Sequence, residues 1–147
     1  MIKRDKNKEA EYLARLAEDV PEFVSYEEFD DLIYIDYDRL GSYIIKLIGS
    51  SNKDDLIILK KTFKHLNSLY KIGNDLVLNI LEVCIFEVLI TNKYGYLVSE
   101  KLMSKSMYQY FISKFPLEKN KDSWNTKEYY SEEEYQKILK LLNDKKD

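Results

Sequence analysis

The chain has few of the residues that interrupt secondary structure: four glycines and two prolines among 147 residues. A β-sandwich or a β-barrel needs many tight turns, and glycine and proline are prominent in such turns. Their scarcity favours long helices and argues against an all-β fold. The apolar content of 45% and the charged content of 33% are those of a folded globular protein. The length predicts one domain, residues 1–147.

Cysteine and histidine occur only once each, which removes most metal and nucleophile chemistry. Cys84 has no second cysteine to pair with, and its apolar neighbours predict a buried thiol in a reducing compartment. His65 follows Lys61 and Lys64 on the lysine-rich side of its predicted helix, so we interpret it as a structural or a solvated imidazole. The sequence contains no metal-ligand spacing, glycine-rich phosphate loop or nucleophile elbow. We therefore expect no enzyme activity, no catalytic residue, no metal and no cofactor.

Long hydrophobic runs are also missing. The most apolar segment, residues 76–91, is interrupted by Asn79, Glu82 and Glu87, so it does not predict a membrane span. Residues 1–8 are basic, but charged residues follow where a secretory signal has its apolar core. The pI of about 5.4 argues against a surface that neutralises nucleic-acid phosphates. We expect a cytoplasmic protein that binds neither nucleic acid nor a membrane.

Apolar residues recur at helical spacing through most of the chain. The expected helices span residues 8–19, 37–49, 54–72, 75–91, 95–103, 105–115 and 131–142. Asp36 and Asn74 are the expected N-caps of two of them, and Gly73 is an expected stop. Residues 32–35 are β-branched and aromatic, which predicts a short extended element. The predicted fold is all-α, a compact single-domain multi-helix bundle with this one extended element.

Three segments are expected to lie outside the helices. Residues 1–7 and 144–147 are predicted to be frayed, and residues 117–130 to form an irregular connection to the C-terminal helix. Trp124 is the expected anchor of that connection to the body of the domain. Residues 131–134, Ser-Glu-Glu-Glu, form a capping box that predicts the start of the last helix.

An acidic and aromatic segment, residues 26–38, holds six carboxylates and no cation. It also belongs to a longer acidic region, since residues 9–38 contain eleven carboxylates and one cation, Arg15. One interpretation is a solvated loop whose apolar residues, Leu32, Ile33 and Ile35, partly fill the core. The other is a recognition surface, in which carboxylates speed the encounter with a basic partner and tyrosines supply contact area. The candidate partner-binding residues are Glu27, Glu28, Phe29, Asp30, Asp31, Tyr34, Asp36, Tyr37 and Asp38.

A secondary candidate face lies on the central helix, where Phe86 is flanked by Glu82 and Glu87. If neighbouring helices cover this face, one glutamate is expected to pair with a lysine, an arginine or a tyrosine. If the face is open, Phe86 between two carboxylates is a suitable anchor for a cationic partner. The strongly apolar character of the rest of the helix favours the covered arrangement.

The order of several apolar motifs resembles a family of small bacterial proteins regarded as immunity-like. The motifs are Val20-Pro-Glu-Phe-Val24, Leu32-Ile-Tyr-Ile-Asp36, the stripe Leu40/Ile44/Leu47, Leu66-Asn-Ser-Leu-Tyr70, Asn74-Asp-Leu-Val-Leu-Asn79 and Val83-Cys-Ile-Phe-Glu-Val-Leu89. The resemblance covers roughly residues 15–112 and includes the polar positions Glu22, Asp36 and Glu87.

This resemblance implies an inhibitor that binds and neutralises a cognate bacterial toxin, without catalysis and without a cofactor. A toxin such as a basic nuclease would be masked by carboxylates that imitate a phosphate backbone, with Tyr26, Phe29, Tyr34 and Tyr37 packed against it. Two other functions stay open from the residues alone. One is a helical adaptor or regulatory protein-binding module without a toxin partner, and the other is a small hydrolase that uses paired carboxylates.

Overall fold

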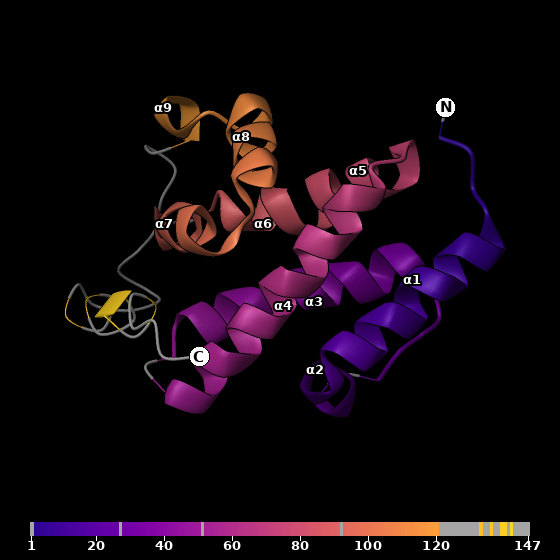
Figure 1. Ribbon diagram of the computed structural model, residues 1–147, viewed down its shortest axis with the longest axis horizontal. Helices are drawn as coiled ribbons and strands as arrows, with labels where there is room; N and C mark the ends of the chain where they lie inside the picture. Colours follow the sequence, from indigo (N-terminus) through magenta and orange to yellow (C-terminus); the bar gives the residue numbers. More distant parts are fainter. Residues whose placement is uncertain are drawn as a thin grey trace.

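The computed structural model describes residues 2–26, 28–50, 52–91 and 93–120, and the single residues Glu133, Gln136, Leu139, Lys140 and Leu142 (Figure 1). Its elements are α1 (Lys6–Asp19), α2 (Pro21–Tyr26), α3 (Ile33–Ile48), α4 (Lys53–Ile72), α5 (Asp75–Ile80), the π-helix η1 (Leu81–Phe86), α6 (Glu87–Leu89), α7 (Lys93–Leu102), α8 (Lys105–Lys114) and α9 (Leu117–Asn120). The described residues contain no strand, which confirms the predicted all-α fold.

Polar side chains fix the ends of the helices. Asp5 is the N-cap of α1, and its carboxylate accepts the backbone N–H groups of Asn7 and Lys8. Asn74 caps α5 through the N–H of Val77, as predicted, and Gly73 ends α4 in the left-handed conformation with a φ of 66°. Because α1 begins at residue 6, the expected frayed N-terminus is too long by at least two residues.

The start of α3 differs from the prediction. Only Leu32 is extended, with φ −116° and ψ 108°, and the helix begins at Ile33 instead of residue 37. The buried stripe of α3 starts with Ile33 and continues through Tyr37, Leu40 and Ile44, so helical periodicity already holds where β-propensity predicted a strand. Burial of this stripe outweighs the weak preference of residues 32–35 for an extended conformation. Asp36 therefore lies in the first turn of α3 and is not its N-cap.

Two short helices were not predicted. Pro21 is the first residue of α2, because the fixed φ of proline and its missing N–H suit the first position of a helix. The expected irregular connection begins with the helical turn α9. Trp124, the capping box at 131–134, most of the expected last helix and residues 144–147 lie outside the described residues.

The helix pair α1 and α2 lies at one end of the molecule, α7, α8 and α9 lie at the other, and α3 and α4 run between them (Figure 1). The continuous stretch α5–η1–α6 passes through the core, where Leu81, Cys84, Ile85 and Phe86 have no exposed surface. The stretch is therefore packed on several sides. None of the helices in the described part of the chain is long and apolar enough to cross a membrane.

A glycine allows α3 to contact the π-helix closely. A Cβ atom on Gly41 would lie 2.4 Å from the carbonyl oxygen of Cys84 and 3.3 Å from Cγ2 of Val88. The backbone of α3 thus rests directly on the backbone of η1. Periodicity assumes 3.6 residues per turn, so the sequence pattern did not indicate the wider turns of η1.

We expect Gly41→Ala to lower the free energy of unfolding by about 1–3 kcal/mol, since the added methyl group overlaps a carbonyl oxygen that cannot move independently. This destabilisation is opposite in sign to the intrinsic helix propensity, which favours alanine over glycine by about 1 kcal/mol. The matched control is Ser42→Ala at the next, exposed position, where we expect a change within about 0.5 kcal/mol. Urea denaturation measures both values. Equal or greater stability of Gly41→Ala would contradict the close approach.

Candidate protein-binding surface

Arg39, just beyond the acidic segment, holds that segment in place from the second turn of α3. Its Nη2 lies 2.8 Å from Oδ2 of Asp30, and its Nη1 donates to the carbonyl oxygen of Glu28 at 2.9 Å. The buried carboxylate of Asp36 completes the arrangement. Its Oδ1 accepts the backbone N–H of Asp30 at 3.0 Å and lies 3.7 Å from Nη1 of Arg39. One cation and one buried carboxylate therefore fix the path of the loop between α2 and α3.

The predicted carboxylates divide into three groups. Glu28, Asp31 and Asp38 are exposed, and the carboxylates of the first two make no hydrogen bond or ion pair with any described residue. Asp30 is exposed but paired with Arg39. Asp36 has no exposed surface, so its assignment as a contact residue is wrong: it holds the loop instead. Glu27 lies outside the described residues.

The predicted aromatic contacts divide similarly. Tyr37 is fully buried, so it cannot contact a partner, and its assignment is also wrong. Tyr34 is half-buried: its hydroxyl donates to Oδ1 of Asn79 at 2.6 Å, and the guanidinium of Arg4 lies 5.2 Å from the centre of its ring. Phe29 is also half-buried, with its ring centre 5.9 Å from that of Phe23. Tyr34 and Phe29 are therefore each only partly accessible to a partner.

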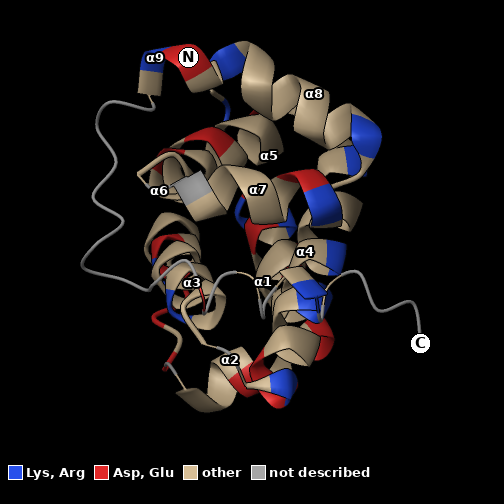
Figure 2. Cartoon of the chain, turned by 90° about the vertical axis from the view of Figure 1, so that its left-hand side faces the viewer, with Lys and Arg blue, Asp and Glu red and all other residues tan. Residues whose placement is uncertain are grey.

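Large apolar side chains are exposed beside these carboxylates. Leu32 is 54% exposed, Tyr26 50% and Ile35 40%. The prediction that Leu32, Ile33 and Ile35 fill the core holds for Ile33 alone, because α3 turns its neighbours outward. Figure 2 shows Asp and Glu gathered around α2 and the segment leading into α3, whereas Lys and Arg are frequent on α4. We call Tyr26, Glu28, Asp31, Leu32, Ile35 and Asp38 the acidic apolar surface.

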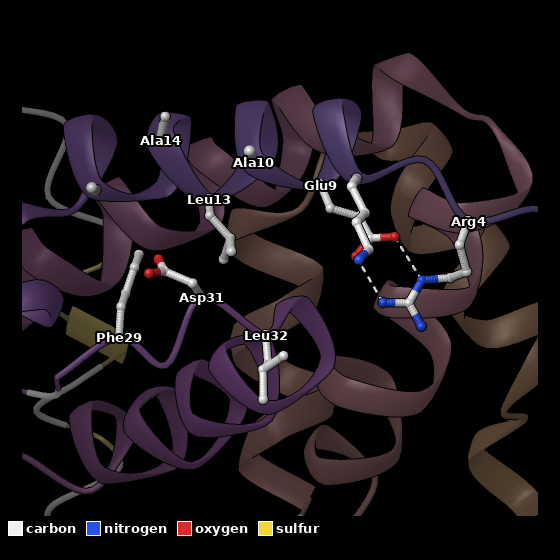
Figure 3. Close-up of a pocket in the computed structure, with 10 residues that line it drawn as sticks. Arg4, Glu9, Ala10, Leu13, Ala14, Phe29, Asp31 and Leu32 are labelled. Atoms are coloured by element: carbon white, nitrogen blue, oxygen red, sulfur yellow. Dashed lines mark hydrogen bonds and ion pairs between the residues drawn. The ribbon is translucent and has the colours of Figure 1, made fainter.

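A groove of about 470 Å³ lies between α1 and the acidic segment (Figure 3). Leu13 and Ala14 of α1 line one side, and Phe29 and Leu32 line the other. Arg4 and Glu9 lie at one end, joined by two hydrogen bonds of 2.6 and 2.7 Å, whereas Asp31 lies toward the other end (Figure 3). The bonds from Arg4 lower the pKa of the Glu9 carboxyl, so this pair stays ionised.

Sequence reasoning missed the α1 side of this groove. The sequence nevertheless contained an indication of the groove in the positions of its only three alanines, Ala10, Ala14 and Ala17. They are spaced by four and three residues, so they share one face of α1, and all three line the groove. Small side chains at these positions leave room that larger ones would fill.

The secondary candidate face is covered by α8. Phe86 is fully buried, with its ring centre 4.9 Å from that of Phe111, so it cannot anchor a partner. The hydroxyl of Tyr110 donates to Oε2 of Glu82 at 2.7 Å, which confirms the expected glutamate partner. Burial, followed by this carboxylate, raises the pKa of the Tyr110 hydroxyl. Glu87 alone of the three candidates is exposed.

His65 is buried, and both nitrogens of its ring are hydrogen-bonded. Nδ1 lies 2.8 Å from Oδ2 of Asp19, and Nε2 lies 2.8 Å from the hydroxyl of Tyr37. An ionised carboxylate only accepts, so Nδ1 carries the proton and Nε2 accepts from Tyr37. The expected structural imidazole is present, and its solvated alternative is wrong because His65 is only 2% exposed. With neither nitrogen free, this arrangement holds α1, α3 and α4 together and offers no base to a ligand.

The described residues form an all-helical domain. The chain belongs to the family described as a domain of unknown function (DUF7674), whose model matches residues 13–117. The matched region contains the whole acidic segment and most of the described helices. No curated protein and no solved structure matches the chain. Among the described residues, no group of three His, Cys, Asp or Glu side chains is placed to hold a metal ion.

The His65 network predicts a stability that depends on pH. Burial lowers the pKa of the ring below its ordinary value of 6.5, and this effect exceeds the opposing effect of the hydrogen bond that Nδ1 donates to Asp19. The unfolded chain then binds a proton more readily than the folded one, so stability is complete above about pH 6.5 and falls as the pH decreases through that value. Chemical denaturation between about pH 7.5 and about pH 5.5 should show this loss.

The variant His65→Gln is expected to lose about 1–3 kcal/mol at neutral pH, because it disrupts two buried hydrogen bonds. Its stability should change less over the same pH range, since the titrating group is gone. If the stability of this variant depended on pH as steeply as that of the parent, the loss of stability would come from carboxylates and not from His65.

Proposed function

We propose that this protein is an immunity-type inhibitor that binds a cognate bacterial toxin through the acidic apolar surface. The observation that carries the proposal is the exposure of Leu32 and Ile35 beside the exposed carboxylates of Glu28 and Asp31, which have no ion-pair partner within the described part of the chain. Apolar anchors surrounded by charge are typical of protein interfaces. The family description assigns no activity, so the support comes from this surface and from the resemblance of the sequence motifs.

The surface suits a preorganised interaction. Arg39 and Asp36 fix the loop before a partner arrives, so less conformational entropy is lost on binding. The carboxylates attract a positively charged partner over a distance of about 10 Å or less at ordinary salt, and the apolar side chains then exclude water from the contact. A toxin with a basic cleft, such as a nuclease, fits both features.

The alternative is a helical adaptor that uses the same surface on another basic protein. The two functions differ in the partner and not in the binding residues. A toxin domain encoded beside the gene of this protein, and bound by it, supports inhibition. An adjacent gene product without toxicity, or without affinity for this protein, contradicts it and leaves the adaptor function.

We expect the double variant Glu28→Gln with Asp31→Asn to associate more slowly with that toxin domain, by about tenfold at low salt. Asparagine is chosen at position 31 because Asp31 has a φ of 59°, a conformation that asparagine also tolerates. The control is Asp75→Asn with Glu100→Gln, which removes the same charge from exposed positions on α5 and α7. Stopped-flow association at two salt concentrations measures the effect. Equal slowing of association in the control variant would show that the effect comes from the change in net charge and not from Glu28 and Asp31.

Leu32→Ala should act on dissociation instead. The side chain is 54% exposed in the free protein, so its truncation should leave the free energy of unfolding within about 0.5 kcal/mol of the parent. If Leu32 is a central anchor, the complex loses about 2 kcal/mol, mainly through a faster off-rate. Ile57→Ala is the matched control, since Ile57 is 47% exposed on α4. Unchanged dissociation of the Leu32 variant would place the interface elsewhere.

A further inference from the structure

We infer that the groove between α1 and the acidic segment is the docking site for a helical segment of the partner, which inserts a large apolar side chain and places a lysine or arginine against Asp31. This inference rests on the proposed function and specifies which part of the surface receives the partner's anchor.

The centre of the groove is apolar and partly open. Leu13 and Ala14 of α1 line one side of the groove, and Leu32 of the acidic segment lines the other. Leu32 remains 54% exposed here, so a group that fills the groove would remove its surface from water. The volume of about 470 Å³ exceeds that of one aromatic side chain, which leaves space for part of a backbone turn.

The ends of the groove differ in charge. Two cations, Arg4 and Lys6, line the groove, and at one end Arg4 already neutralises Glu9 through two hydrogen bonds. Toward the other end, the carboxylate of Asp31 is exposed and has no partner among the described residues. An occupant with a cation beside its apolar side chain therefore gains an ion pair at Asp31 without breaking an existing one.

The negative charge of residues 9–38 favours a basic partner in the groove over a second copy of this chain. Residues 9–38 hold eleven carboxylates and one cation, so a symmetric dimer through this groove would bring two acidic regions together. The three alanines on one face of α1 allow close approach, and a helix is the element that such a flat face suits.

The test uses the full chain and two short synthetic helix-forming peptides that carry a fluorophore, one of leucine and lysine and the other of leucine and glutamate. Fluorescence anisotropy measures binding. We expect the leucine–lysine peptide to bind at least about tenfold more tightly than the leucine–glutamate peptide, because opposite charge is required at Asp31. Ala14→Trp fills the groove and should weaken binding of the leucine–lysine peptide by about tenfold or more.

Two further variants distinguish binding in the groove from non-specific attraction between opposite charges. Ser106→Trp places the same bulky group at an exposed position on α8 and should bind like the parent. Asp31→Asn should weaken binding by several-fold and reduce its salt dependence. Equal affinities of the parent, Ala14→Trp and Ser106→Trp would overturn the inference, since the peptide would then adhere by charge alone. So would a concentration-dependent dimer that Ala14→Trp abolishes.

The peptides also keep this inference separate from the proposed function. If the toxin domain binds but Ala14→Trp affects neither the toxin nor the peptide, the acidic apolar surface acts without the groove. If the groove binds the leucine–lysine peptide and no toxin domain binds, the groove serves a different basic protein and the immunity function is contradicted.

Discussion

The ion pair between Arg39 and Asp30, supported by the buried carboxylate of Asp36, is the interaction on which the proposed binding surface depends. An isolated surface ion pair contributes little, commonly less than about 1 kcal/mol. Here the guanidinium also donates to a backbone carbonyl, and Asp36 is fully buried, so the contacts act together. They hold an acidic loop in one conformation despite its repulsive charge, and they leave Asp31 and Leu32 exposed beside α1.

Helical periodicity predicted most of the fold. It placed α4 and the buried stretch α5–η1–α6 well, because long apolar stripes and residues such as Gly73 and Asn74 are strong local signals. It failed at residues 32–35, where local β-propensity was weaker than burial of Ile33 within a helical stripe. It also could not show the π-helix, because a helical pattern assumes 3.6 residues per turn, and it could not show the contact of Gly41 with the backbone of η1, which joins residues far apart in the sequence.

The candidate site was predictable in part. The composition of residues 26–38 identified the acidic segment. The burial of Asp36 and Tyr37 could not be predicted in the same way, because it depends on which face of α3 points inward. Three distant residues, Asp19, Tyr37 and His65, form one network that no spacing in the sequence predicts. The groove needed the fold as well, because its two sides come from α1 and from a loop that reaches it only after α2 reverses the chain.

The most direct test of the central claim is hydrogen exchange of the backbone amides, measured with and without the proposed partner, a toxin domain encoded beside the gene. The claim is that a preformed acidic loop and the adjoining face of α1 receive the partner. It predicts that the amide of Asp30 is already protected in the free protein, because it donates to Asp36. It further predicts that the complex adds protection over residues 28–38 and 10–17. Added protection confined to α7 and α8 would contradict it.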